Sequence, residues 1–190
     1  MSLNTWQETL LAHRGDGTAL TAAAAASLLQ GSTATRAKYT FPANFFEVNK
    51  EIEVVATGRI SCAVTTPGTA RFDFRLGGTV VFDSLAINLN VVAKTNVHWH
   101  LYLRLICQAA GDSTTATLFP AEARWTSEAV VGSPLPTAGG SGIVLLPYNT
   151  APAVGAGFSS IVSQQADLFF TQTVATGSCQ LHTFGIRALN

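Results

Sequence analysis

Apolar and polar side chains alternate with a period of two between Val97 and Ala109, and this pattern restricts the fold more than any other feature. The apolar positions are Val97, Trp99, Leu101, Leu103, Leu105, Cys107 and Ala109. Most of the residues between them are polar, among them His98, His100 and Arg104. Successive side chains of a β-strand point to opposite faces of the sheet, so this period is typical of a strand with one buried face. The segment therefore predicts a long, half-buried strand.

The same period recurs along most of the remaining chain. It predicts further strands at residues 38–41, 51–63, 69–76, 79–82, 85–91, 114–125, 143–146, 166–174 and 179–188. Two turns predict hairpins between neighbouring strands: Thr65–Gly68, with its Pro-Gly pair, and Ala175–Ser178. With eight or nine of these segments as its strands, and no long amphipathic helix between them, the chain favours a single all-β antiparallel sandwich of jelly-roll type.

The N-terminal segment does not continue this pattern. Leu3, Trp6 and Leu10 share one face of a helix, in a stretch that also has the spacing of a capping box. These features predict a short helix near residues 5–13. The alanine-rich run Ala22–Leu29 fits either a helix or an extended arm.

The sequence is accordingly divided into two parts. An N-terminal arm at residues 1–36 consists of the short helix and an extended link, and the sandwich occupies residues 37–190. Within the sandwich, residues 126–165 are rich in glycine and proline and show little regular pattern. Loops longer than about 15 residues without secondary structure are uncommon, and they are usually functional or lie on a partner. This loop is therefore a candidate recognition segment.

The composition excludes several classes of partner. The 190 residues carry 11 basic and 11 acidic side chains, which gives a formal net charge of +0. Because this chain has no excess of basic residues to bind a phosphate backbone, nucleic acid is not expected as a partner. The N-terminus lacks the basic region and apolar stretch of a signal peptide, and no membrane span is predicted. The three cysteines, an odd number, are expected to be reduced and buried.

The low charge also indicates contacts with other proteins. Only 12% of the residues are charged and 47% are hydrophobic, so we expect another protein or another copy to cover part of the surface. The candidate interface residues are Leu3, Trp6, Leu10, Trp125, Tyr148 and Phe158. Trp6 has the strongest claim because it lies in the arm, outside the sandwich. Asp73, between Arg71 and Arg75 on one outer face, is expected to be exposed or paired across a subunit boundary.

The strongest catalytic pattern in the chain is the pair His98 and His100, whose spacing on one strand face suits two metal ligands. A cupin-like enzyme would place further ligands nearby, but Arg104 stands where a carboxylate is wanted and His182 lies on a different strand. Nothing else in the chain assembles a nucleophile, a base and an oxyanion donor. We therefore expect no enzyme, no cofactor and no metal site, and a cupin-like metal enzyme is the remote alternative.

Several turn and strand signatures are spread over nearly the whole chain: Leu3–Leu10, Phe41–Phe46, Gly58–Ser61, Thr65–Thr69, Ala93–Val97, Thr126–Glu128 and Gly132–Pro134. Together they resemble those of small jelly-roll structural proteins of tailed bacteriophages. The resemblance implies a virion component: a capsid decoration or cement protein, a head fibre or a tail-associated module. It implies nothing about chemistry, because the matching residues are signatures of a fold.

From this resemblance we expect a decoration or cement protein that binds and stabilises the capsid through its arm and its sandwich surface. The expected partners are further copies of itself, as a homotrimer or else a dimer, and the major capsid protein or a neighbouring virion protein. The protein would be made in the host cytoplasm and located in the virion. The alternative is a tail or head-fibre module that contacts the host surface through residues 126–165.

Overall fold

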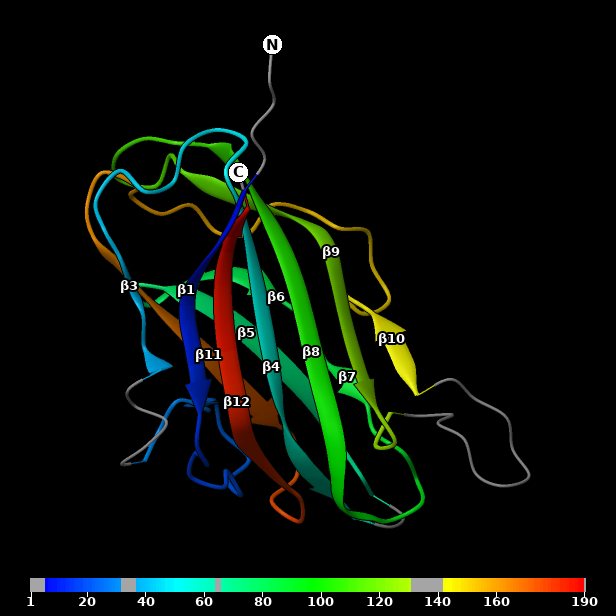
Figure 1. Cartoon of the computed structure of the whole chain (residues 1–190). Helices are drawn as coiled ribbons and strands as arrows, with labels where there is room; N and C mark the ends of the chain where they lie inside the picture. The colour runs from blue at the N-terminus through cyan, green and yellow to red at the C-terminus, as the bar shows by residue number, and fades with distance from the viewer. Residues whose placement is uncertain (1–5, 32–36, 64–65, 131–141, 190) are drawn as a thin grey trace.

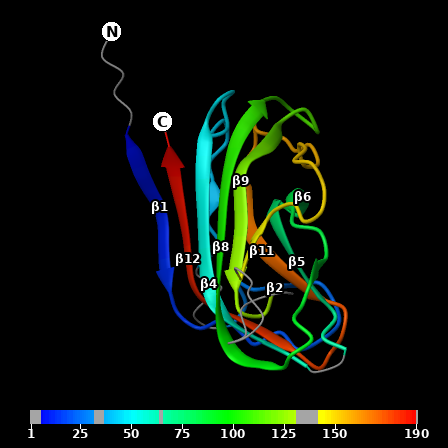
Figure 2. The same ribbon diagram turned by 90° about the vertical axis from the view of Figure 1, so that its right-hand side faces the viewer.

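The computed structural model describes residues 6–31, 37–63, 66–130 and 142–189. In these ranges the chain is all-β, without an α-helix, and its strands form two antiparallel sheets that face each other (Figures 1 and 2). The strands are β1 (Gln7–Arg14), β2 (Ala26–Ser27), β3 (Thr40–Phe41), β4 (Glu51–Cys62), β5 (Thr69–Leu76), β6 (Thr79–Asp83), β7 (Ile87–Asn88), β8 (Lys94–Ala109), β9 (Thr117–Ser127), β10 (Ile143–Leu145), β11 (Gln164–Gln172) and β12 (Ser178–Leu189).

The first sheet has the strand order β1-β12-β4-β8-β9-β10, and the second has the order β2-β11-β5-β6. The short strands β3 and β7 join the second sheet by pairing with β11 and β5. The all-β expectation is confirmed. The described residues hold twelve strands where eight or nine were expected, and β1 and β2 come from the segment in which no strand was predicted.

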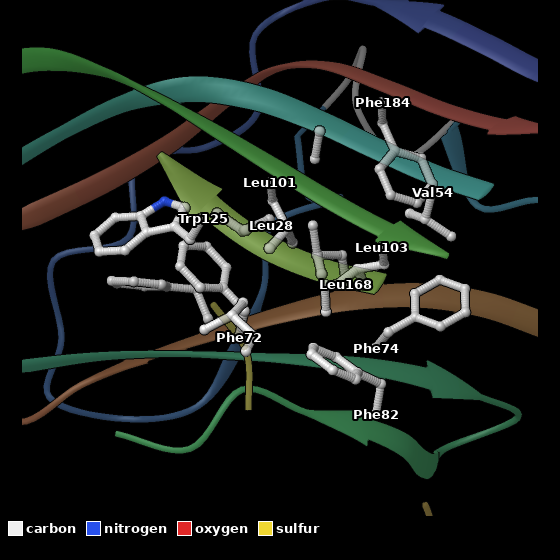
Figure 3. Close-up of a cluster of buried hydrophobic side chains, with 14 of the residues drawn as sticks. Leu28, Val54, Phe72, Phe74, Phe82, Leu101, Leu103, Trp125, Leu168 and Phe184 are labelled. Carbon is white, nitrogen blue, oxygen red and sulfur yellow. The ribbon is translucent and has the colours of Figure 1, made fainter. Parts of the chain in front are cut away.

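The core lies between the sheets and is built from the apolar positions of the alternating strands. On β8 the side chains of Trp99 and Leu101 are fully buried, as the alternation predicts. The ring of Phe72 on β5 lies 5.3 to 5.4 Å, between centroids, from those of Trp99, Trp125 and Phe170. Figure 3 shows Phe72 beside Trp125, with residues of both sheets around them. This aromatic cluster therefore joins the two sheets at the centre of the core.

The helix predicted near residues 5–13 is wrong, because residues Gln7–Arg14 form strand β1 at one edge of the first sheet. β1 pairs with β12 at seven positions, with a bulge between Thr9 and Leu11. Both Leu10 and Leu11 pack against the core. A helical spacing of apolar residues could not reveal this arrangement, because the partner strand lies at the other end of the chain and tertiary pairing overrides local propensity.

The alanine-rich run also enters the sandwich. Its last residues include β2, which pairs with β11 in the second sheet. Leu28 and Leu29, directly after β2, are fully buried. The hydroxyl of Ser27 donates a hydrogen bond to Asp167 on β11 at 2.5 Å. The segment expected to be an arm therefore contributes one strand to each sheet and two leucines to the core.

Both predicted hairpins are wrong in their pairing. β4 lies in the first sheet and β5 in the second, so the turn that ends at Gly68 carries the chain from one sheet to the other. The turn between β11 and β12 does the same. Alternation shows that each strand buries one face, but it cannot show whether the next strand lies beside it or opposite it across the core. The Gly77-Gly78 pair, by contrast, joins β5 and β6 in a true hairpin, with φ values of 56° and 92°.

The strand predicted at residues 85–91 is much shorter in the structure. Only Ile87–Asn88 forms a strand, β7. Ile87 and Leu89 are buried, whereas Leu85 and Val91 are exposed. Leu85 has a φ of 58°, which interrupts the extended backbone that the alternation requires.

The long loop predicted at residues 126–165 is shorter in the structure, because β9 extends to Ser127 and β11 begins at Gln164. Within it, residues 142–163 close the side of the sandwich between β9 and β6. The amide of Leu146 donates to the carbonyl of Ala123 on β9 at 2.9 Å, and the amide of Ala156 donates to Val80 on β6 at 3.1 Å. This part of the predicted recognition loop therefore lies on the chain's own sheets, and residues 131–141 are outside the described residues.

Candidate interaction surface

Two of the predicted interface residues lie in the core. Trp125 is 0% exposed, because it takes an inward position on β9 and packs on Phe72. Phe158 is 2% exposed, pairs with Ala116 in an isolated bridge and contacts Phe46, with 5.2 Å between ring centroids. Neither side chain can reach a partner while the sandwich stays closed.

The other predicted interface residues differ in exposure. Leu10 and Tyr148 are half-buried and pack against the core, so each offers only part of its surface. Trp6 is 54% exposed and lies directly before β1. Leu3 lies outside the described residues. Of the five candidates among the described residues, Trp6 is thus the one at the surface as a large exposed side chain.

The outer face of the first sheet carries charges that pair across strands. Glu53 on β4 accepts hydrogen bonds from Tyr102 on β8 at 3.0 Å and from Arg187 on β12 at 2.8 Å. One step along the sheet, Arg104 donates two hydrogen bonds to Glu51, at 2.8 and 3.1 Å. Burial, and then the hydrogen bond to Glu53, raise the pKa of Tyr102, so its phenol stays protonated and donates. The arrangement stabilises a polar sheet face and leaves these groups engaged with one another.

His98 and His100 also lie on this outer face, since the residues between and after them, Trp99 and Leu101, are buried. Burial, followed by the nearby charge of Arg124 and the neighbouring His98, lowers the pKa of His100. Within the described residues, no three side chains of His, Cys, Asp or Glu gather closely enough to hold a metal ion.

The outer face of the second sheet holds a compact group of opposite charges. Asp73 is only 4% exposed and accepts a hydrogen bond from Arg75 at 3.0 Å, and the Nε of Arg71 lies 3.4 Å from its other oxygen. Arg71 also donates to Asp83, with 2.8 Å from Nε to Oδ1. Burial raises the pKa of Asp73, and the hydrogen bond from Arg75 counteracts part of that effect. Asp73 is therefore paired within its own chain, and neither exposure nor a subunit boundary is needed to explain it.

Two hollows adjoin the C-terminal half of β1. The first, of about 360 Å³, lies over the small residues Ala12 and Gly185 and has Arg14 and Arg187 in its lining. The second, of about 510 Å³, is lined by Arg14, Gly15, Asp16, His182 and Thr183.

In the second hollow, Asp16 and the ring of His182 are 2.6 Å apart, and this hydrogen bond lowers the pKa of Asp16. Arg14 is exposed and has no ion-pair partner within the part of the chain that the structure describes.

An apolar edge that the sequence did not reveal lies at strand β10. Ile143 and Leu145 pair with Thr126 and Arg124 on β9 and are 51% and 74% exposed. The apolar run predicted a strand here, but its face could not be assigned, because three residues are too few for an alternation and the edge position depends on the strand order. The structure therefore adds two exposed aliphatic side chains to the candidate surface.

Comparison of the chain with protein-family models, with curated proteins and with solved structures found no match. Among the described residues, no helix has both the length and the apolar character needed to cross a membrane.

Proposed function

We propose that this chain is a structural protein of a tailed-bacteriophage particle, built on a jelly-roll fold and attached to the capsid as a decoration or cement protein. The proposal combines the resemblance of its turn and strand signatures with two structural features. These features are the scheme by which the strands pair and the apolar edge at β10.

The strand pairing supports the jelly roll. In that architecture an antiparallel ribbon of eight strands wraps around a core, so that successive strand pairs alternate between two sheets. Here the pairs β1 with β12, β2 with β11, β4 with β8 and β5 with β6 alternate in this way between the first and second sheets. The strands β9 and β10 extend the first sheet beyond β8, and β3 and β7 are small additions to the second. Viral capsid proteins, lectins and cupins all use this architecture, so the role must be argued from the surface.

The observation that carries the attachment role is the exposure of Ile143 and Leu145 on the edge strand β10. Full burial of one such aliphatic side chain contributes about 1.5–3 kcal/mol relative to full exposure. Two of them on one short strand, at the margin of a sheet on which Glu51 and Glu53 are already paired with arginines, favour contact with another protein. A capsid shell offers many equivalent sites for such a contact.

We place the attachment on the sandwich surface and not on a free arm. The N-terminal segment contributes β1 and β2 to the two sheets and buries Leu28 and Leu29. Detaching this segment to grip a neighbour would break both pairings and expose two leucines, at a cost comparable with the stability of a whole domain. An edge such as β10 needs no such rearrangement.

Copy counting tests the proposal. Particles of the phage that encodes this chain are purified, and the chain is quantified against the major capsid protein. We expect a ratio near one per capsid subunit, or per regular group of subunits, because a cement protein occupies sites repeated over the whole shell. A handful of copies per particle would favour the tail or head-fibre alternative, and absence from particles would contradict a virion role.

Variants test the surface. Leu145→Asp should lower the number of copies that particles retain, because a carboxylate cannot be buried against an apolar site without cost. Val48→Asp is the matched control, since Val48 is 57% exposed on the loop before β4 and is not part of the β10 edge. Both variants should unfold at the wild-type temperature. Equal retention of the two variants would remove β10 from the attachment surface.

A further inference from the structure

Strand β1 ends the first sheet, and no strand of the described residues pairs with its outer edge. Figure 2 shows β1 at the margin of the sheet, with this edge turned away from the second sheet. No proline or lysine interrupts the eight residues from Gln7 to Arg14. An edge of this length presents backbone groups that can bind a further strand, and natural proteins commonly block such edges with proline, lysine or a bulge. Of these three devices, β1 has the bulge between Thr9 and Leu11.

We propose that a second copy of this chain binds along this edge. Its β1 would lie antiparallel to the first around a two-fold axis, so that the first sheets of the two copies form one continuous sheet. This dimer is independent of the particle to which the chain attaches. It goes beyond the proposed function, because it concerns a different edge of the first sheet from the one assigned to the capsid.

The distribution of charge along β1 favours the antiparallel arrangement. Glu8 lies in the N-terminal half of the strand, and His13 and Arg14 lie in the C-terminal half. A two-fold axis places the N-terminal half of each strand against the C-terminal half of the other, so the acidic end faces the basic end in both copies. A parallel arrangement would place like charges together.

The bulge in β1 selects a register for this pairing. Thr9 lies opposite Arg187 of β12, and Ala12 lies opposite Gly185. The outer face of β1 therefore carries Gln7 and Thr9 before the bulge, and Ala12 and Arg14 after it. Directly opposite residues of an antiparallel pair point to the same face. The register that meets this condition around the strand centre pairs Thr9 with the partner's Ala12 and Gln7 with the partner's Arg14. On the inner face it pairs Glu8 with the partner's His13.

The same register gives the exposed Trp6 a place to bind. One residue beyond the pair of Gln7 and the partner's Arg14, Trp6 lies opposite the partner's Gly15. Gly15 lines the hollow of about 510 Å³ at the end of β1, together with Arg14. Trp6 lies before the first residue of β1, so the alternation of the strand does not hold its side chain to the face of Glu8, and its indole can turn into this hollow. There it buries apolar surface and meets a guanidinium that has no ion-pair partner within its own described chain. Trp6 and this hollow occur once per chain, so the two-fold axis fills both hollows.

The test is the mass of the full chain in solution, measured by sedimentation or light scattering over a concentration series. We expect a reversible dimer, and the amides of β1 should exchange more slowly with deuterium at concentrations where the dimer forms. A monomer at every concentration, or a trimer, would overturn the proposal, since a two-fold pairing of β1 closes at two copies.

Charge variants at Gln7 test the register. In each copy this exposed side chain faces the partner's Arg14, so the dimer contains the contact twice. Gln7→Glu should tighten the dimer and Gln7→Arg should weaken it, each by about two- to tenfold in dissociation constant. Combining Gln7→Arg with Arg14→Glu should restore the dimer. The matched control is Gln108→Arg on β8, an exposed glutamine of the same sheet away from this edge.

Replacement of Trp6 by alanine should weaken the dimer by about tenfold or more. A dimer that is indifferent to Trp6→Ala and to both Gln7 charges would show that the copies meet elsewhere, and the proposal would be overturned. These measurements use the isolated chain, so their outcome is separate from that of particle copy counting.

Discussion

At the scale of single residues, Gly58 shows how the core constrains one position of β4. Gly58 faces inward opposite Trp99 on β8. A Cβ atom added there would lie 1.9 Å from the carbonyl oxygen of Gln180 and 2.7 Å from the indole of Trp99. The indole of Trp99 therefore fits because this position has no side chain of its own.

Gly58→Ala should accordingly lower the free energy of unfolding by about 3 kcal/mol, through the strain of overpacking. The control is Gly185→Ala on the neighbouring strand β12, where a Cβ would meet its nearest atoms at 3.5 and 4.0 Å, ordinary contact distances. That variant should change the stability by less than about 0.5 kcal/mol. Chemical denaturation measures both, and similar losses for the two variants would contradict the packing explanation.

Asp73 gives a prediction about pH. Burial raises its pKa above the ordinary value of 3.8, so the folded protein binds a proton at Asp73 at a higher pH than the unfolded chain does. The contribution of this group to stability is therefore fully present below pH 3.8 and is lost as the pH rises through its folded pKa. Asp73→Asn carries no titrating group there.

As the pH is lowered from 7 toward 4, the unfolding free energy of the wild-type protein should therefore rise relative to that of Asp73→Asn. Urea denaturation of both proteins at several pH values measures this difference, and the effects of the other acidic groups cancel in it. If the unfolding free energy of the wild-type protein instead falls relative to that of Asp73→Asn on acidification, then Arg71 and Arg75 outweigh burial and hold the pKa of Asp73 below its ordinary value.

At the scale of elements, the sequence predicts a strand wherever the alternation is long. It does not predict a strand that forms only because it pairs with a segment far away in the chain. β4, β5 and β8 appear close to their predicted positions, because each buries every second side chain over eight or more residues. β1 was predicted as a helix and β2 as part of an arm, because their strand character comes from β12 and β11, which are distant in the sequence.

The pairing of elements was harder to predict than their existence. A strand that buries one face satisfies the same alternation whether its neighbour in sequence lies beside it or across the core. The chain crosses between sheets after β4 and after β11, and in neither case does the local turn reveal this. The Gly77-Gly78 turn is the informative exception, since two consecutive residues with positive φ match the twist of a two-residue hairpin.

The candidate surface follows the same rule. The exposure of Trp6 could be predicted, because this residue precedes the regular alternation of the chain; its role as an anchor stays a prediction. The exposure of Ile143 and Leu145, and the position of β1 at an edge among the described strands, depend on which strands end the first sheet. Strand order is set by contacts between residues far apart in sequence, so periodicity alone could not identify these edges.

At the scale of the whole molecule, the N-terminal segment decides whether the chain folds as one unit. If the division at residue 36 marked an independent arm, removal of residues 1–31 would leave a stable sandwich. The structure predicts the opposite, because this truncation deletes β1 with its seven paired positions and β2 with the two buried leucines after it.

Loss of a buried leucine side chain alone costs about 2–5 kcal/mol, and whole domains are stable by only about 5–15 kcal/mol. The chain without residues 1–31 should therefore show no cooperative thermal unfolding, whereas removal of residues 1–5 should leave the transition near the wild-type temperature. Circular dichroism during heating distinguishes the two. A cooperative transition at the wild-type temperature in the longer truncation would show that the sandwich folds without its first two strands, and attachment through a free arm would then again be the better model.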